Sequence, residues 1–393
     1  MYFFQDDIGL LIQHARNNFW QFLILPQAEH FAPLLHLFTY LEFKLFGLNF
    51  YGYFCFSLIL HFLNLLLLYR ILILLKLSKK LALTVTLLFF INLTFVEPFL
   101  WFSAQGVILA NLFIALSFYF FLKRSIFIYF SILAAAFSYS TGLGLGIIFG
   151  LLSLIQGKFN FYFFLVGIIS VVIGPLVAAD KLGQIIPVIR NPIIDILLYL
   201  AFVIGGVGRG VFSRLFLPGF EPRHFETSKT LFSFLPFALI ASLVVFLQRS
   251  ASVKFRQLLL SLPFLIVYPY IWAGAVRFHF GIKQALAERY AYTPLFFTVI
   301  LTGILLKYFF AKKILNSNNI LALMVFILLI FQTVVFHNKA VEFEKRPLQT
   351  EKYIDQLKLK IENNEILPDY PLPSYINQPL KVPDLYPILK RDL

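Results

Sequence analysis

The chain has 393 residues, of which 60% are hydrophobic and only 13% are charged, and its formal net charge is +14. Soluble domains contain about half apolar and about a quarter charged residues, and the surplus apolar surface here needs lipid to cover it, so the composition excludes a water-soluble globule. The excess of Lys and Arg serves first to predict which side of the membrane each connection between spans occupies. We expect no nucleic acid as a partner. The lone cysteine, Cys55, excludes an internal disulfide and a Cys-rich metal site.

Residues 1–50 form a predicted external loop that precedes the first span. The adjacent carboxylates Asp6 and Asp7 stand before a short helix-like stretch, where they either cap a helix start or take part in catalysis. Further on, residues 34–45 place apolar and polar side chains on opposite faces, which predicts a helix lying in the membrane interface. The apolar face comprises Leu34, Leu37, Phe38, Leu41 and Leu45, and the polar face comprises His36, Thr39, Tyr40 and Lys44.

Residues 51–336 form the predicted transmembrane domain, with about ten apolar stretches that are long enough, or nearly long enough, to cross a bilayer. The stretches are 54–75, 81–96, 106–122, 126–139, 143–155, 159–179, 231–247, 258–276, 291–306 and 320–336. The short pair 126–139 and 143–155 flanks Thr141-Gly142, which predicts a tight hairpin. One long kinked helix is the alternative, and it would place every later connection on the opposite side of the membrane.

The charges between the stretches predict the orientation of the chain. Alternate connections are rich in Lys and Arg, whereas those at 97–105 and 140–144 carry neither. Cytoplasmic loops collect these cations, so the other connections are expected on the non-cytoplasmic side. The segments predicted there are 1–50, 180–230, 277–290 and the C-terminal tail 337–393.

Two further segments complete the predicted architecture. The apolar segment 193–217 has both ends on the non-cytoplasmic side, and its glycines at 205–210 predict a broken, re-entrant element. In the tail, residues 350–364 predict a charged helix, and the prolines that follow favour extended chain. The predicted fold class is therefore an all-α polytopic membrane protein with a re-entrant segment and external interfacial helices.

Cations gather in two predicted external loops, although the positive-inside rule disfavours them there. The later loop contains Arg277, Lys283 and Arg289, the last between Glu288 and Tyr290. Cations on this side either bind an anionic lipid phosphate or reach ordinary headgroups from the membrane interface. Their clustering favours a binding site. The earlier loop contains Arg209, Arg214, Arg223 and Lys229.

Four segments together resemble the GT-C glycosyltransferases, in particular the branch of protein O-mannosyltransferases and their bacterial relatives. They are FFQDDIG (3–9), FGLNFYGYFCFSLILHFLNLLLLY (46–69), VEPFLWFSAQGVILANLF (96–113) and AERYAYTPLFF (287–297). The resemblance implies a GT-C-like fold in a bacterial inner or plasma membrane. It also implies inverting transfer of a sugar from a polyprenyl phosphate to a protein or glycan hydroxyl on the non-cytoplasmic face. No cofactor is assured, and a divalent cation is left open.

The resemblance also implies roles for individual residues. Asp6 or Asp7 would act as the general base, and Arg289 would stabilise the leaving phosphate. Glu288 is expected to orient Arg289, while Trp101 contacts the sugar or belongs to an interfacial aromatic belt. The predicted substrate-binding residues are Arg289, Glu288, Tyr290, Lys283, Arg277, Glu97, Trp101 and His30. On the first span, His61 and Asn64 are expected to hydrogen-bond between helices.

The sequence departs from this branch at three points. Phe31-Ala32-Pro33-Leu34 stands where the branch often has Arg-Pro-Leu, and Gln105 stands where it often has Arg. The acidic motif follows Met1 almost at once, whereas the family places a span before it. We therefore expect an additional hydrophobic helix upstream of Met1.

Three other functions compete with this interpretation. A flippase or transporter for a lipid-linked sugar would also use cations and broken helices. A polysaccharide polymerase or ligase would share the lipid donor but transfer a whole glycan. A purely structural membrane scaffold leaves the external cations unexplained.

Overall fold

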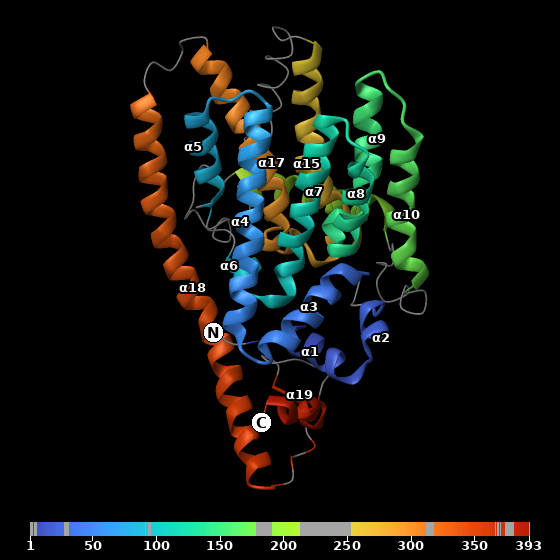
Figure 1. Ribbon diagram of the computed structural model, residues 1–393, viewed down its shortest axis with the longest axis vertical. Helices are drawn as coiled ribbons and strands as arrows, with labels where there is room; N and C mark the ends of the chain where they lie inside the picture. Colours follow the sequence, from blue (N-terminus) through green and yellow to red (C-terminus); the bar gives the residue numbers. More distant parts are fainter. Residues whose placement is uncertain are drawn as a thin grey trace.

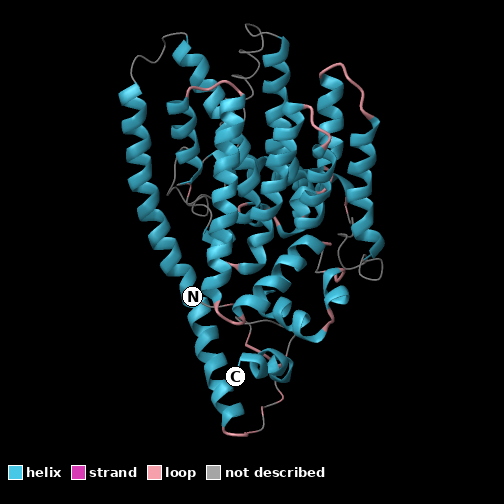
Figure 2. Cartoon of the chain, in the orientation of Figure 1, coloured by secondary structure: helices cyan, strands magenta, loops and turns pink. Residues whose placement is uncertain are grey.

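The computed structural model describes residues 3, 6–26, 31–90, 92, 96–177, 191–212, 253–311, 318–365, 367, 369, 371–373 and 381–392. This part of the chain is almost entirely helical (Figure 2) and contains no strand, only an isolated bridge between Pro371 and Lys381. The all-α class predicted from the sequence is therefore confirmed.

The first half of the chain forms α1 Asp6–Arg16, α2 Phe19–Leu23, α3 Pro33–Phe46, α4 Phe50–Leu74, α5 Lys79–Phe90, α6 Val96–Leu100, the 3-10 turn η2 Phe102–Ala104, α7 Gln105–Lys123, α8 Phe127–Ser138, the 3-10 turn η3 Ser140–Gly142, α9 Leu145–Ile155 and α10 Phe161–Val177. The second half forms α12 Pro192–Gly205, the π-helix η5 Gly206–Phe212, α15 Val253–Arg277, the 3-10 turn η7 Phe278–Phe280, α16 Ile282–Ala285, α17 Glu288–Ala311, α18 Asn318–Glu362, the 3-10 turn η8 Val382–Leu385 and α19 Tyr386–Asp392.

Four helical segments of the described residues are long and apolar enough to cross a membrane. They are Phe50–Leu74, Phe102–Lys123, Leu258–Phe280 and Glu288–Tyr308. The stretches 81–96, 126–139, 143–155 and 159–179 correspond to α5, α8, α9 and α10, which have 12, 12, 11 and 17 residues. As described, each of these helices is shorter than a typical membrane span, which has about 20 residues. The stretch 231–247 lies outside the described residues, so the count of about ten spans stays a prediction.

Helices α8 and α9 form the hairpin expected at Thr141-Gly142. The α7–α8 turn and the α9–α10 turn lie at the same end of the bundle, where Asn160 Nδ2 donates a hydrogen bond to Tyr129 OH (2.8 Å). Consequently α8 and α9 run in opposite directions on either side of η3. A side chain at Gly142 would place its Cβ 2.2 Å from the carbonyl group of Ala135, so only glycine fits this close approach.

The glycine-rich segment after residue 192 changes its helical form instead of continuing as a straight α-helix. Helix α12 gives way at Gly206 to the π-helix η5, a form that is rare and occurs mostly as single turns. A Cβ at Gly206 would lie 2.3 Å from the ring of Tyr270, so the glycine permits close packing against α15. The end of the predicted re-entrant segment, 213–217, lies outside the described residues.

The main core lies between α4, α5, α7, α15 and α17 (Figure 1). Polar side chains join these helices, as expected for His61 and Asn64. His61 Nδ1 lies 2.6 Å from Tyr292 OH, and Asn64 Nδ2 donates to the carbonyl oxygen of Ile108 (3.1 Å). Asn111 Nδ2 donates to Asn64 Oδ1 (2.7 Å). Such bonds fix neighbouring helices where apolar contacts alone specify little.

A second, smaller core lies at the end of the molecule where α1 and α19 are found (Figure 1). Ile8 and Leu11 of α1 pack there with Leu385 and Leu389 near the C-terminus. Helix α18 extends from the main helical bundle into this core and carries Leu357 to it. One 45-residue helix thus runs through the boundary between 336 and 337 that the hydropathy pattern predicts.

Helix α3 crosses this end of the bundle with its more polar face inward. His36, Thr39 and Glu42 are buried, whereas Leu41 and Leu45 are exposed. Of the predicted apolar face, Leu41 and Leu45 are exposed whereas Leu34 and Phe38 pack against the main core, so the interfacial position of α3 stays a prediction.

Candidate functional site

The two acidic residues of the first turn of α1 have different surroundings. Asp7 is fully buried, and its Oδ1 accepts hydrogen bonds from both the backbone N–H and the hydroxyl of Ser103, each 2.7 Å long. Asp6 is exposed. Asp7 therefore joins α1 to η2 through hydrogen bonds. Asp6 is the member of the pair whose carboxylate lies at the surface.

Glu97 and Arg289 form an ion pair between the starts of α6 and α17. The guanidinium Nη1 of Arg289 donates to Glu97 Oε1, and the backbone N–H of Arg289 donates to Glu97 Oε2 (3.1 Å). In return, the backbone N–H of Glu97 donates to Glu288 Oε2 (3.1 Å). Each carboxylate thus satisfies an N–H group at the start of the other helix, a position that favours negative charge.

The expected pairing of Glu288 with Arg289 is wrong in this structure. Glu97 orients the Arg289 side chain, whereas Glu288 Oε1 accepts from Lys339 Nζ of α18 at 2.9 Å. The reason is geometric, because consecutive residues of a helix point in different directions. Glu288 and Arg289 therefore meet partners on different neighbouring helices.

Aromatic rings surround the Arg289 guanidinium. Its Cζ lies 5.0 Å from the ring centroid of Trp101 and 4.9 Å from that of Tyr290, within the range of cation–π attraction. Only 11% of the Arg289 side chain and 15% of the Glu97 side chain are exposed. The ion pair is therefore largely shielded from water, which strengthens its electrostatic interaction.

A short segment connects the acidic motif to Arg289. Trp101 lies against Arg289 and Ser103 holds Asp7, so the two contacts are two residues apart in the chain. Tyr139 lies within range of the charges of Arg289, Glu97 and Asp6. The structure thus brings residues 6–7, 97–103 and 288–290 together.

The other predicted site residues have different positions. Arg277 ends α15 and Lys283 lies on α16, both in the segment that leads to α17. The contacts described for Arg289 are with Glu97, Trp101 and Tyr290. His30 lies outside the described residues, as do Arg214, Arg223 and Lys229, whereas Arg209 belongs to η5.

Sequence reasoning missed three residues of this cluster: Ser103, Tyr139 and Lys339. Lys339 lies in the predicted external tail, so the positive-inside rule that drew attention to Arg289 would also have selected it. Ser103 lies within a segment that carries the family resemblance, but nothing in its sequence surroundings marks it as the partner of Asp7. Nothing in the sequence around Tyr139 indicates that it lies near Arg289.

The charges of the cluster have consequences for ligand binding. Glu97, Glu288, Arg289 and Lys339 together cancel to zero, and both Glu97 oxygens accept from Arg289. Within the residues that the structure describes, no three His, Cys, Asp or Glu side chains come together as a metal site. Beside Asp7, Asp6 adds an exposed carboxylate, and the Arg289 guanidinium retains N–H groups beyond the one that Glu97 accepts from.

Comparisons of the chain with known protein families, with curated proteins and with solved structures find no match. The family resemblance of the four segments therefore stays a prediction.

Proposed function

We propose that the chain is a GT-C-like glycosyltransferase with about ten spans that transfers a sugar from a polyprenyl phosphate to a protein or glycan hydroxyl on the non-cytoplasmic face. One observation carries the proposal. Asp7, whose neighbour Asp6 is an exposed carboxylate, and the largely buried guanidinium of Arg289 both contact residues 101–103, although they lie far apart in the chain. Transfer from a lipid phosphate needs this combination of a base and a phosphate-binding cation.

The reaction assigns one task to each group. The acceptor oxygen attacks the anomeric carbon of the donor, and the bond from that carbon to the phosphate oxygen breaks. Asp6 takes the proton of the acceptor hydroxyl, and the lipid phosphate leaves as an anion that Arg289 stabilises. A single displacement of this kind inverts the configuration of the sugar.

The ion pair with Glu97 suits Arg289 to this role. A guanidinium has five N–H donors, so it can hold Glu97 and a phosphate together. The Glu97 contact and the Trp101 ring fix the direction of the side chain before the donor arrives. Because the four charges of the cluster cancel, a phosphate needs a further cation nearby, and Lys283 or Arg277 in the preceding segment would supply it.

The test is mass spectrometry of the products formed when the purified protein is incubated with polyprenyl-phosphate sugars and acceptors. Asp6→Asn should lower the turnover roughly 10²–10⁴-fold and leave donor affinity nearly unchanged, because a base is lost but no phosphate contact. Asp355→Asn, an exposed acid on α18, is the matched control. Donor binding without sugar transfer in the unaltered protein would instead favour a flippase, and a product larger by a whole glycan would favour a polymerase or ligase.

A further inference from the structure

A second site candidate lies far from the residues discussed so far. A cavity of about 580 Å³ opens between the α7–α8 turn and the α9–α10 turn. Helix α7 begins two residues after Ser103 and has 19 residues. At about 1.5 Å per residue it is about 28 Å long. The cavity is therefore at the opposite end of the bundle from the Asp7–Arg289 cluster.

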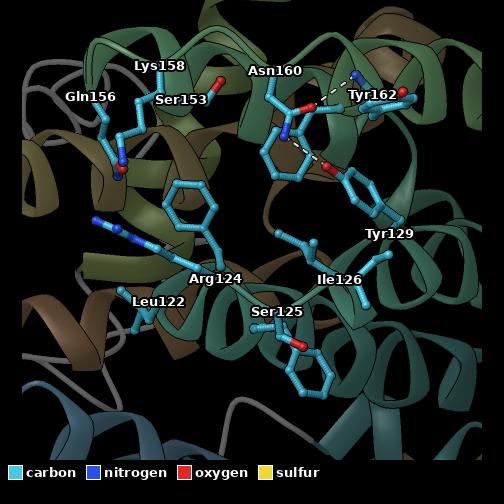
Figure 3. Close-up of a pocket in the computed structure, with 14 residues that line it drawn as sticks. Leu122, Arg124, Ser125, Ile126, Tyr129, Ser153, Gln156, Lys158, Asn160 and Tyr162 are labelled. Atoms are coloured by element: carbon cyan, nitrogen blue, oxygen red, sulfur yellow. Dashed lines mark hydrogen bonds between the residues drawn. The ribbon is translucent and has the colours of Figure 1, made fainter.

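The cavity joins cations at its mouth to an apolar interior. Arg124 and Lys158 are exposed, and Figure 3 shows their side chains and that of Gln156 extending toward one side of the cavity. Ile128 and Phe163, which also line it, are buried. No carboxylate is among the described lining residues, and no ion pair of Arg124 or Lys158 is found in the described part of the chain. The mouth is thus positively charged.

The surroundings of the mouth are apolar and aromatic. Ile126, Phe159 and Tyr162 lie in or beside the two turns and are 77%, 67% and 65% exposed. Side chains of this type at the ends of apolar helices are typical of a membrane interface. A ligand that enters here therefore comes from the headgroup region of the bilayer and has an anionic end and an apolar body.

We infer that this cavity binds the phosphate group of an anionic membrane lipid, with Arg124 and Lys158 at the phosphate and the acyl chains along the apolar wall. Basic pockets between transmembrane helices are suited to such headgroups, and Arg binds phosphate through several N–H groups at once. The proposal does not depend on the reaction at the other end of the molecule. A soluble phosphate compound shares the same chemistry and is the alternative source of the ligand.

Arg124 offers a variant that removes the charge without endangering the fold. Its backbone lies in the left-handed region, with φ 55°, where glycine has no steric cost. Arg124→Gly should therefore fold at least as well as the unaltered protein. Lys76 has the same backbone conformation, with φ 62°, after the end of α4, and it does not line the cavity. Lys76→Gly is the matched control for both charge and backbone.

The experiment measures phosphatidylglycerol binding to the full chain in detergent by native mass spectrometry. Arg124→Gly should weaken binding about tenfold or more, because a charge-assisted contact is lost. Lys158→Gln should also weaken it, Lys76→Gly should not, and zwitterionic phosphatidylcholine should bind less than phosphatidylglycerol. Equal losses in Arg124→Gly and Lys76→Gly, or no loss in Arg124→Gly, would overturn the site. Inorganic phosphate that displaces the lipid at comparable concentration would overturn the lipid as its ligand.

Discussion

At the residue scale, the carboxyl group of Glu42 lies within α3 and is only 2% exposed. Gln105 Nε2 donates to its Oε1 (2.9 Å) and also lies 3.0 Å from Ser57 Oγ. Burial raises the pKa of Glu42 to about 8, and the hydrogen bond from Gln105 acts in the opposite direction. At neutral pH, Glu42 is therefore protonated in the folded protein, which explains how a carboxyl group is accommodated there without a cation.

Glu42→Gln should remove a pH dependence of stability. The unfolded chain releases this proton near the ordinary pKa of 4.5, whereas the folded chain retains it up to about 8, so stability falls as the pH rises between these values. At about 1.4 kcal/mol per pKa unit, the loss is at most about 5 kcal/mol. Thermal unfolding in detergent across this range would measure it. Glu362→Gln, which alters an exposed glutamate of α18, should keep the dependence, and an unchanged profile in Glu42→Gln would contradict the assignment.

The Glu97–Arg289 pair should be worth more than an exposed pair of the same protein. Asp369 and Lys381 form a bridge of 3.2 Å but are 69% and 55% exposed, and such pairs contribute below about 1 kcal/mol. Hydrogen bonds to charged groups shielded from water contribute about 1.5–3 kcal/mol. Double-mutant cycles of unfolding with Glu97→Gln and Arg289→Met, and with Asp369→Asn and Lys381→Met, measure both coupling energies. Equal values would show that the clustered pair adds nothing beyond an ordinary surface bridge.

At the scale of elements, the sequence predicts helices well where hydrophobicity is continuous. The stretches 54–75, 106–122, 258–276 and 291–306 coincide with the four long apolar helical segments. Local hydropathy does not predict where these helices end, because it depends on composition and not on the contacts that a helix makes. Helix α5 ends at Phe90 although the apolar stretch continues to 96, and α18 continues far beyond 336.

The candidate site shows a sharper limit of sequence reasoning. The residue types are visible in the chain, but Asp7 and Ser103 are 96 positions apart and Glu97 and Arg289 are 192 apart. No local periodicity specifies such pairings. The positive-inside rule selected the loop that contains Arg289, yet it could not distinguish Glu288 from Glu97 as its partner.

Helix α19 should hold α1 in place. Leu389 is fully buried in the small core that also contains Ile8 and Leu11 of α1. Leu389→Ala should cost about 2–5 kcal/mol locally, because it leaves a cavity there. Amide hydrogen exchange in α1 should accelerate while α4 and α7 stay protected. Leu359→Ala, at a position that is 58% exposed, is the matched control, and unaltered exchange in α1 of the Leu389 variant would show that α19 does not stabilise it.

At the scale of the whole molecule, the two ends of the bundle differ in character. One end carries the clustered acids and cations of the proposed transferase site, and the other carries the cation-lined cavity at the α7–α8 and α9–α10 turns. If α4, α7, α15 and α17 cross a bilayer, these two sites face different compartments. A substrate at one end and a lipid at the other would then never compete.

Single-cysteine labelling tests this arrangement, because Cys55 is the one cysteine of the chain and Cys55→Ser gives a thiol-free background. Gln356→Cys lies on the part of α18 beside the small core, and Lys80→Cys lies at the opposite end, beside the α4–α5 turn (Figure 1); both positions are exposed. The positive-inside rule places the lysine-rich turn in the cytoplasm. A membrane-impermeant maleimide should therefore label Gln356→Cys in intact cells and Lys80→Cys only after permeabilisation. Labelling of both positions from the same side would refute the membrane crossing. The reverse pattern would preserve the crossing but put the Asp6–Arg289 cluster in the cytoplasm, which contradicts the proposed sidedness of the reaction.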